Sequence, residues 1–306
     1  MNPRTRRSIV FALAALSLSP AIPAAVEPVP VEILRDRIEQ IAKHAEGRVG
    51  VAATVVESGE TVTLRATDRF PMQSVYKLPI AMAALAAAEQ GKLALDARIQ
   101  VGADDLVPAK VHSPFRDQHP KGAETTLEEL LRLALVESDG TASDVLLRLL
   151  GGPAAANAAV AALGGSGFVI ATTEKEMARG EDVQYRNWAT PAGIGQLLVA
   201  IQAGKVLNDA DRARLVAWMT ASTPGAKRLR GLLPPEAVVA HKTGTSPTQN
   251  GLTRATNDVG IVTLPNGKHL AIAVFVADSS ADEATREAVI ARIAEAAWKF
   301  FGPSWR

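Results

Sequence analysis

The sequence of 306 residues contains no cysteine. Disulfide bridges, thiolate metal sites and cysteine nucleophiles are therefore excluded, and the protein must be stable without covalent cross-links. Aromatic residues make up only 4%, and the formal net charge is +1. Neither a stacking surface for bases nor a basic surface for nucleic acid is indicated. The histidines show no ligand spacing, so we expect no metal; they are His44, His112, His119, His241 and His269.

The N-terminal segment lacks an apolar run long enough to cross a membrane. Its apolar run, residues 9–18, is half of the roughly 20 residues that a membrane span needs. Arginines within residues 4–7 precede this run and a Pro/Ala-rich stretch follows it, which is the pattern of a secretory signal peptide. We expect cleavage near Ala24 or Ala25 and a periplasmic or secreted protein. The paired arginines leave the general and the twin-arginine export routes both open.

The chain as a whole has the composition of a globular protein with a large core, with 47% hydrophobic and 21% charged residues. Apolar residues recur at helical or alternating spacing in well-separated segments. Helical patterns lie at 31–46, 74–91, 126–137, 143–150, 153–163, 190–204, 209–221 and 282–300, and strand patterns at 49–57, 61–66, 237–244, 257–264 and 269–277.

The order of these elements predicts an α/β (α+β) fold with two lobes. Strands at both ends of the chain most simply form one antiparallel five-stranded sheet that carries both terminal helices. We expect residues 1–25 to be the signal peptide, residues 26–73 and 222–306 to form a discontinuous α/β lobe, and residues 74–221 to form an all-helical lobe. The cleft between the lobes is the favoured place for a site.

The motif SVYK places Ser74 and Lys77 three residues apart at the start of a helix. Side chains at this spacing are neighbours about 5–6 Å apart. A hydroxyl beside a desolvated amine is a candidate nucleophile with its base. With 14 serines and 11 lysines in the chain, chance supplies roughly half of one such pair. The pair therefore needs support from other motifs.

The triplet KTG at residues 242–244 ends a strand pattern and is followed by Thr245. Chance would produce this triplet only about 0.05 times in such a chain. An ammonium beside threonine hydroxyls can bind a carboxylate. An edge strand that ends with a solubilising lysine and a turn glycine is the alternative interpretation.

The triplet SDG at residues 138–140 follows a helix that begins with a capping box. Taken alone it is a weak motif, and a helix terminator with a turn glycine is the favoured interpretation. Ser143 and Asp144 form a second Ser-Asp pair, which looks like a helix N-cap. The order of the three motifs along the chain gives SDG its weight.

Together, SVYK, SDG and KTG are similar to the motif trio of class A β-lactamases and penicillin-binding proteins, in which Asn is the usual third residue of the second motif. Residues 172–191 and 240–267 further resemble the PER-type branch of the class A serine β-lactamases. The resemblance runs from about Val31 to the end of the chain. It implies a mixed helix-and-sheet lobe packed on a helical lobe, with the site between them.

The resemblance also implies roles for individual residues. Ser74 would be the nucleophile that attacks the β-lactam carbonyl, and Lys77 would accept its proton. The backbone N–H groups of Ser74 and Thr245 would form the oxyanion hole, and Ser138 would pass a proton to the departing ring nitrogen. The substrate carboxylate would be held by Lys242, Thr243, Gly244 and Thr245, with Arg228 as the second cation; a solvated surface arginine is the alternative for Arg228.

One carboxylate separates a hydrolase from a protein that is merely acylated. Counting back from Asn187 in the PER-type pattern selects Glu174 over Glu176 for this role. A carboxylate at this position can deprotonate the water that attacks the acyl ester.

Several residues depart from the pattern of the family. Gly140 stands where most relatives have an Asn, so one substrate contact is missing and the cleft should be locally wider. Ala178 stands where an Asn commonly helps to hold the hydrolytic water. Thr172 and Asn187 replace the Arg-Asp pair that often ties the loop neck, which suggests a differently folded loop. Pro79 should force a tight first turn in its helix.

The sequence leaves two alternatives to a β-lactam hydrolase. A D,D-peptidase of the penicillin-binding type shares the three motifs but does not need Glu174. A non-catalytic β-lactam sensor would stay acylated, and would normally need a membrane or signalling segment. We expect a monomer that needs no cofactor and whose partner is a small β-lactam.

Overall fold

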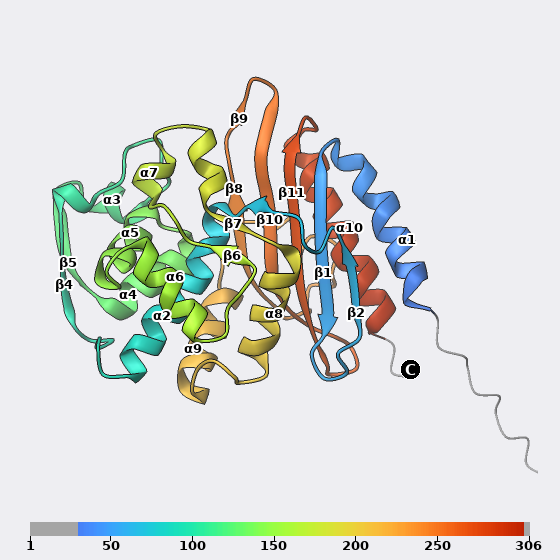
Figure 1. Cartoon of the computed structure of the whole chain (residues 1–306), viewed down its shortest axis with the longest axis horizontal. Coiled ribbons are helices and arrows are strands. Elements are labelled where there is room, and N and C mark those ends of the chain that lie inside the picture. Colours follow the sequence, from blue (N-terminus) through green and yellow to red (C-terminus); the bar gives the residue numbers. More distant parts are fainter. Residues whose placement is uncertain (1–29, 303–306) are drawn as a thin grey trace, which may run out of the picture.

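The computed structural model describes residues 30–302, so the expected signal peptide lies outside the described residues. Seen along the view of Figure 1, the molecule has three layers: a helical region, a central sheet, and the helices α1 (Val31–Ala42) and α10 (Glu283–Phe301) on the outer face of the sheet. The helices α1 and α10 pack against each other although they lie at opposite ends of the chain. The expected fold class is confirmed.

The central sheet has the order β2-β1-β11-β10-β8, with antiparallel neighbours throughout. These strands are β1 (Arg48–Val55), β2 (Thr61–Leu64), β8 (Val239–Thr245), β10 (Leu252–Thr263) and β11 (His269–Ser279). They are the five strands expected from the alternating patterns. A short strand that was not expected, β9 (Thr248–Gln249), pairs with β10 beyond the end of β8.

Strand β11 shows why the sheet is buried on both faces. Its even-numbered residues from Leu270 to Val276 pack with α1 and α10 in one core cluster. Its odd-numbered residues from Ala271 to Ala277 belong to the other cluster, with the helical region, because successive side chains of a strand point to opposite faces. Three of these four odd-numbered residues are alanines, so helix α8 (Pro191–Gln202) can pack closely on β11 and β1.

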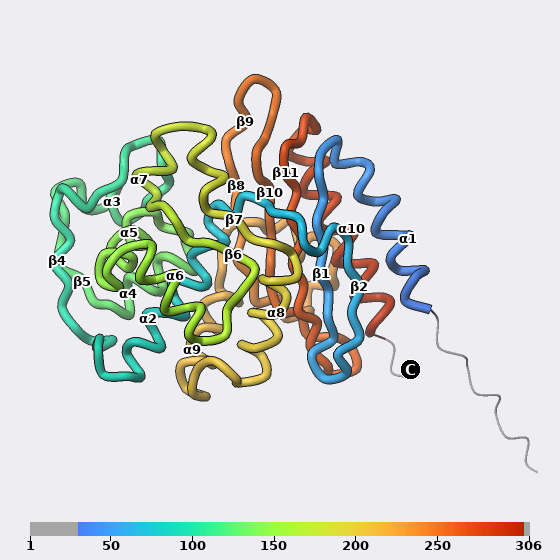
Figure 2. The backbone as a smooth tube through the Cα atoms, viewed as in Figure 1, coloured from blue at the N-terminus to red at the C-terminus, as the bar shows by residue number. Residues whose placement is uncertain are grey.

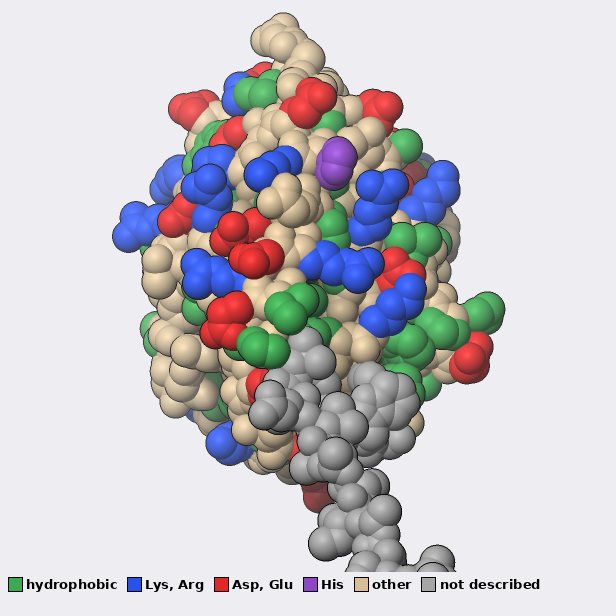
Figure 3. Space-filling model, turned by 90° about the vertical axis from the view of Figure 1, so that its right-hand side faces the viewer, with side chains coloured by type: hydrophobic (Ala, Val, Ile, Leu, Met, Phe, Trp, Pro, Cys, Tyr) green, Lys and Arg blue, Asp and Glu red, His purple; other side chains and the backbone are tan. Residues whose placement is uncertain are grey.

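The outer face of the molecule is polar. Figure 3 shows basic and acidic side chains interspersed over the side on which α1 and α10 lie, with scattered apolar side chains between them. Leu34 and Ile38 of α1 point inward and are buried. This pattern is typical of an amphipathic helix on the surface of a globular protein.

The helical region also contains short strands, so the expectation that residues 74–221 are entirely helical is wrong. The loop at 101–124 begins and ends in a hairpin at the far edge of the region (Figure 2), formed by β4 (Arg98–Gly102) and β5 (Gly122–Thr126). Without a helical apolar period, this segment satisfies its backbone groups by pairing its two ends. A second small sheet consists of β3 (Phe70–Pro71), β6 (Phe168–Val169) and β7 (Trp188–Ala189).

The helices of this region are short and closely packed. They are α2 (Lys77–Glu89), α3 (Pro114–Gln118), α4 (Leu127–Arg132), α5 (Gly140–Leu149), α6 (Pro153–Ala162), α7 (Glu174–Met177) and α9 (Asp209–Thr220). No single helix in the described part of the chain is long and apolar enough to cross a membrane, although α5 and α6, bent by 74°, pass that test as a pair. The proposed boundaries of the two lobes remain a prediction.

The segment that carries Ser74 is a 3-10 turn, η2 (Gln73–Tyr76), which leads into α2. Pro79 is the third residue of α2, where a backbone N–H has no partner within the helix. The expected tight first turn is therefore confirmed.

Strand β8 and the turn η2 approach each other most closely at Gly244. A Cβ atom at this position would lie 2.3 Å from the carbonyl oxygen of Met72 and 3.2 Å from the Cβ of Gln73. Only a residue without a side chain lets the strand lie against the turn. Gly244 thus sets the distance between the KTG strand and Ser74.

We expect Gly244→Ala to destabilise the fold by about 1–3 kcal/mol, because the added methyl group pushes against rigid backbone. The free energy of unfolding, measured by urea denaturation, tests this. Gly102→Ala is the matched control, since a Cβ there would meet nothing within 4 Å. Equal stabilities of the two variants would contradict the close approach at Gly244.

Candidate active site

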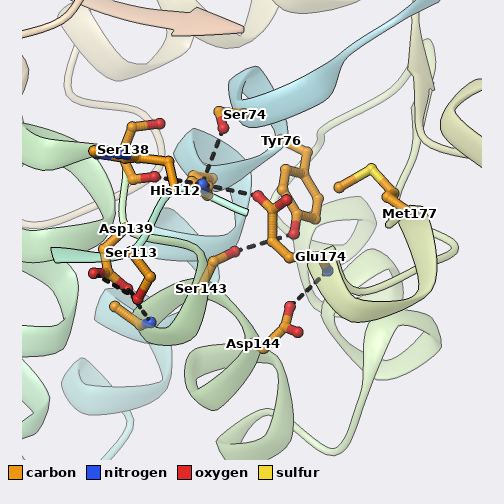
Figure 4. Close-up of polar contacts among 12 residues, drawn as sticks. Ser74, Tyr76, His112, Ser113, Ser138, Asp139, Ser143, Asp144, Glu174 and Met177 are labelled. Carbon is orange, nitrogen blue, oxygen red and sulfur yellow. Dashed lines mark hydrogen bonds and ion pairs between the residues drawn. The ribbon is translucent and has the colours of Figure 1, made fainter. Parts of the chain in front are cut away.

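A cavity of about 610 Å³ opens between the helical region and the edge of the sheet at β8. Figure 4 shows the polar side chains that converge beside it. Six of the residues expected from the sequence line the cavity, and they come from four separate segments of the chain: Ser74, Lys77, Ser138, Glu174, Thr243 and Thr245. The fold therefore brings the three motifs and the selected carboxylate to one place.

Lys77 is at the centre of these contacts. Its Nζ donates hydrogen bonds to Ser74 Oγ at 2.9 Å and to the carbonyl oxygen of Ser138 at 2.8 Å. It also lies 2.8 Å from Glu174 Oε1, and only 2% of the Lys77 side chain is exposed. Ser74, expected to be the nucleophile, thus has a buried nitrogen within hydrogen-bonding distance.

Lys242 reaches the site from the other side, through Ser138. Its Nζ donates to Ser138 Oγ at 2.9 Å and to the carbonyl oxygen of Thr243 at 3.0 Å. Lys242 is fully buried and does not itself line the cavity. Burial, and secondly the positive charge of Lys77, lower the pKa of Lys242 well below its usual value. A lysine in this state exchanges a proton with Ser138 more readily than an exposed lysine does.

Two residues of the site have unusual backbone conformations. Gln73 and Ser138 have φ angles of 47° and 59°, in the left-handed region that residues other than glycine rarely adopt. Ser138 lies between the π-helical turn η4 (Leu133–Glu137) and α5, and its carbonyl oxygen is held by Lys77. Gln73 precedes Ser74, and its side-chain amide donates to Gln184 in the loop beyond α7. Such local strain is common at functional sites.

Glu174 is the first residue of the short helix α7. Thr173 caps this helix, accepting a hydrogen bond from the N–H of Glu176, while the Glu176 carboxylate accepts one from the N–H of Thr173. The Glu176 side chain is therefore occupied by the cap. Glu174 is free of this role, and its carboxylate pairs with Lys77.

Asp144 fixes the backbone of Glu174, and the sequence did not indicate this. Its carboxylate accepts hydrogen bonds from the N–H of Glu174 at 2.7 Å and of Lys175 at 3.1 Å. The interpretation of Ser143 and Asp144 as a helix N-cap is wrong, because both lie inside α5 and are buried, and Asp139 is the cap. The available signal was a carboxylate directly before the apolar helical run at residues 145–150.

Burial, and secondly the carboxylate of Glu174, raise the pKa of Asp144 from 3.8 to about 7. The two backbone N–H groups act in the opposite direction but do not offset the burial. Asp144 thus titrates near neutral pH, although it is an aspartate.

The loop from Thr172 to Asn187 is closed by an amide in place of an ion pair. Asn187 Oδ1 accepts from the N–H groups of Ala171 at 2.7 Å and Thr172 at 2.9 Å, and Asn187 Nδ2 donates to the Thr172 carbonyl at 3.0 Å. One buried asparagine therefore holds both sides of the loop neck. This agrees with the expectation of a loop that differs from the Arg-Asp type.

Gly140 does not widen the cleft, contrary to the expectation. A Cβ atom at this position would lie 2.8 Å from Val111 Cγ1 and 3.1 Å from the carbonyl oxygen of His112. The loop that contains Val111 and His112 fills the space and lines the cavity itself. Asp139 holds this loop, since its buried carboxylate accepts hydrogen bonds from the Ser113 hydroxyl and the N–H of Phe115.

Arg228 lies in neither of the two places expected from the sequence, the substrate site or the solvated surface. Its guanidinium is buried, 3.1 Å from Glu287 Oε1, and donates to the carbonyl oxygen of Asn257 at 3.0 Å. It does not line the cavity, so the role of second cation for the substrate carboxylate is not supported. It is not a solvated surface arginine either. Gly244 also lies outside the lining, because its function is the close approach to Met72.

The model of the β-lactamase enzyme family matches residues 33–301. The chain is 37% identical to the β-lactamase VEB-1 of Pseudomonas aeruginosa, over 87% of this chain and 89% of that protein. It is 36% identical to the extended-spectrum β-lactamase PER-1 of the same organism, over 88% of this chain and 87% of that protein.

Solved structures give the same result. The crystal structure of a β-lactamase from Chitinophaga pinensis superposes with a TM-score of 0.85 at 46% identity, covering 87% of this chain and 98% of that chain. The similarity thus includes nearly the whole fold as well as the motifs.

Asp144 should make the stability of the protein depend on pH in a characteristic way. Because folding raises its pKa from 3.8 to about 7, the folded protein keeps a proton that the unfolded chain has released between these values. The stabilisation is fully present below pH 3.8 and is lost as the pH rises through about 7. We expect Asp144→Asn to lack this dependence.

Urea denaturation at a series of pH values measures the difference in unfolding free energy between the wild type and each variant. This difference should change between pH 3.8 and about 7 for Asp144→Asn. Asp282→Asn is the control, because Asp282 caps α10 with a pKa below 3.8, and its difference should stay flat over that range. A flat curve for Asp144→Asn would show that folding does not raise the pKa of Asp144 above 3.8.

Proposed function

The chain belongs to the class A β-lactamases and is a hydrolase of β-lactams, and from this premise we propose that it acts through a Ser74 acyl-enzyme that is deacylated by a water activated by Glu174. The observation that carries the proposal is the position of Lys77, whose Nζ lies within 3 Å of Ser74 Oγ and of Glu174 Oε1. The nucleophile and the carboxylate are thus linked by one buried nitrogen.

Acylation begins when Ser74 Oγ attacks the lactam carbonyl carbon. In its amine form, Lys77 accepts the Ser74 proton at 2.9 Å. The backbone N–H groups of Ser74 and Thr245 stabilise the negative charge that develops on the carbonyl oxygen. Ser74 and Thr245 both line the cavity, which supports this assignment.

Cleavage of the C–N bond needs a proton for the ring nitrogen. Ser138 supplies it from Oγ, and Lys242, 2.9 Å away, replaces it. The lowered pKa of Lys242 favours this transfer. Lys242 therefore acts through Ser138, which alone of the two lines the cavity.

The substrate carboxylate binds at the strand side of the cavity. Thr243 and Thr245 line it and offer hydroxyl donors, and Lys242 contributes a buried charge behind them. Arg228 is left out of this set because Glu287 already pairs with it.

Deacylation depends on Glu174. Its carboxylate removes a proton from a water, and the resulting hydroxide attacks the acyl ester. Ser74 leaves as the alcohol when Lys77 returns the proton. Glu174 then releases to solvent the proton it took from the water, and Lys242 takes up one in place of the proton it gave to Ser138, so both groups are restored. Ala178 also lines the cavity. It has no side-chain amide to hold this water, so Glu174 positions the water with fewer hydrogen-bonding partners than is common in the family.

We expect Glu174→Ala to slow deacylation by about 10²–10⁴-fold, because a general base is lost. Mixed with a chromogenic cephalosporin, this variant should give one burst of colour and a stoichiometric adduct in the intact mass spectrum. Ser74→Ala should give no adduct. Glu176→Ala is the matched control on the same helix, and should keep turning over because it loses only a helix cap.

The alternatives give different outcomes with the wild-type protein in the same assay. A D,D-peptidase and a sensor would both form the adduct and stop. The D,D-peptidase alone would also release D-alanine from a peptide substrate. Rapid turnover by Glu174→Ala, or arrest of Glu176→Ala with its adduct, would assign the base to another carboxylate.

We further propose export of the protein, since residues 1–25 have the pattern of a signal peptide. N-terminal sequencing of protein recovered from a periplasmic fraction should begin at Ala25 or Val26, after cleavage near Ala24 or Ala25. Recovery of the protein with residues 4–7 intact in that fraction would contradict cleavage.

A further inference from the structure

A buried asparagine of strand β10 holds the backbone just before Ser74, and the mechanism above does not use it. Asn257 is 0% exposed. Its side-chain Nδ2 donates hydrogen bonds to the carbonyl oxygens of Pro71 at 2.8 Å and Met72 at 3.1 Å. Both partners only accept hydrogen bonds, so the amide nitrogen must face them. Within the described part of the chain its Oδ1 has no partner, so the side-chain hydrogen bonds of Asn257 all go to this backbone.

The carbonyl group of Met72 is the point at which η2, β8 and β10 meet. It accepts the first hydrogen bond of the turn η2, from the N–H of Val75 at 3.2 Å. Strand β8 approaches it at Gly244, where a Cβ atom would lie 2.3 Å from the same oxygen. Asn257 pairs with Gly244 across the sheet, and directly paired residues have their side chains on the same face. Because Gly244 has no side chain, the amide of Asn257 can meet the turn beside it.

The same carbonyl group belongs to the peptide that precedes the strained residue Gln73. The φ angle of Gln73, 47°, describes the rotation between the Met72 peptide group and the Gln73 Cα, and residues other than glycine rarely adopt it. Such a conformation persists only when the surrounding structure holds it. If the Met72 peptide group were released, φ would relax, and the next peptide group would turn with it. That next peptide group carries the N–H of Ser74, which is proposed to form half of the oxyanion hole.

Arg228 holds the backbone of Asn257 in turn. Its buried guanidinium donates to the carbonyl oxygen of Asn257 at 3.0 Å and lies 3.1 Å from the carboxylate of Glu287 in α10. The backbone of Asn257 is thus fixed by its two neighbouring strands, β8 and β11, and by a buried cation. Arg228 therefore supports the site from behind the sheet edge, without lining the cavity.

We propose that Asn257 is a positioning residue for the oxyanion hole, which holds the Met72 carbonyl group and thereby keeps the N–H of Ser74 aimed at the reacting carbonyl oxygen. This inference rests on the proposed Ser74 acyl-enzyme. The two halves of the proposed oxyanion hole come from separate elements, Ser74 from η2 and Thr245 from β8. Asn257 ties the first of these elements to the sheet that carries the second.

Asn257→Leu keeps the size of the side chain and removes both hydrogen bonds. We expect kcat/KM for a chromogenic cephalosporin to fall about 10²-fold, because a displacement of about 1 Å at a reacting group costs this much. Deacylation should slow as well, since the same N–H group stabilises the second tetrahedral intermediate. Glu174→Ala, by contrast, should slow deacylation alone.

Asn157→Leu is the matched control. Asn157 also holds a backbone group with its side-chain amide, since its Oδ1 accepts from the N–H of Ile170 at 3.0 Å, but neither of these residues lines the cavity. The control loses a comparable hydrogen bond at another place in the helical region. Its kcat/KM should stay at the wild-type value.

An infrared measurement separates positioning from general damage to the fold. Hydrogen bonds from an oxyanion hole polarise the ester carbonyl of an acyl-enzyme and lower its stretching frequency. The acyl-enzyme should accumulate in Glu174→Ala, so its band can be recorded there with a penicillin that is isotope-labelled at the lactam carbonyl. Adding Asn257→Leu should move this band to higher frequency, whereas adding Asn157→Leu should leave it in place. Lower stability alone would not move the band, because the folded molecules would keep an intact oxyanion hole.

Asn257→Ala is the second variant for the case in which leucine does not fit the site. It removes the same donors without filling the space of the amide. The band should move in the same direction as for Asn257→Leu, and kcat/KM should fall as well.

The outcomes distinguish this inference from the proposed function. If neither the wild type nor Glu174→Ala forms an acyl-enzyme on Ser74, the proposed function fails, and the inference fails with it. If the acyl-enzyme forms but the Asn257 variants leave its carbonyl band in place, only the role of Asn257 is overturned, even where kcat/KM falls. A band that moves equally with Asn157→Leu would assign the effect to a general loosening of the fold and would overturn that role too.

Discussion

The buried nitrogen of Lys77 is the constraint on which the site depends. A charged amine removed from water costs several kcal/mol unless it is paired and hydrogen-bonded. Its three contacts come from Ser74, Ser138 and Glu174. Ser74 lies in the turn before the helix of Lys77, whereas Ser138 and Glu174 lie about 60 and about 100 residues further along the chain. Satisfying this nitrogen therefore brings the parts of the site together, and the same contacts position Ser74, the proposed nucleophile.

The loops around the site are each held by a single polar side chain. Asp144 binds the start of α7, Asn187 closes the loop neck, and Asp139 holds the loop of Val111 and His112. In each case a side-chain oxygen accepts N–H groups that have no partner in a helix or strand. Buried loops of this kind need such acceptors, and one of the three, Asp144, is a carboxylate beside Glu174, which is proposed to act as a base.

These contacts also change what the departures from the family pattern mean. At Gly140, helix α5 closely approaches the loop of Val111 and His112, and the side chain of Val111 occupies the space that a side chain at position 140 would need. Asn187 closes the loop neck with hydrogen bonds from an uncharged side chain. These local features lie around the site, while Lys77 contacts Ser74, Ser138 and Glu174.

The sequence by itself determined the sheet, the terminal helices and the identities of Ser74, Lys77, Ser138 and Glu174, because the apolar periods and the short motifs are local properties of the chain. It could not place Arg228, whose charge is taken by Glu287, nor identify Asp144 as the residue that holds the start of α7 or Asn257 as the residue that holds Met72. Those relations join residues 30 to 185 positions apart. Only the packing of α5 against α7 and of β10 against η2 decides which buried oxygen meets which proton, since burial and pairing are properties of the folded chain.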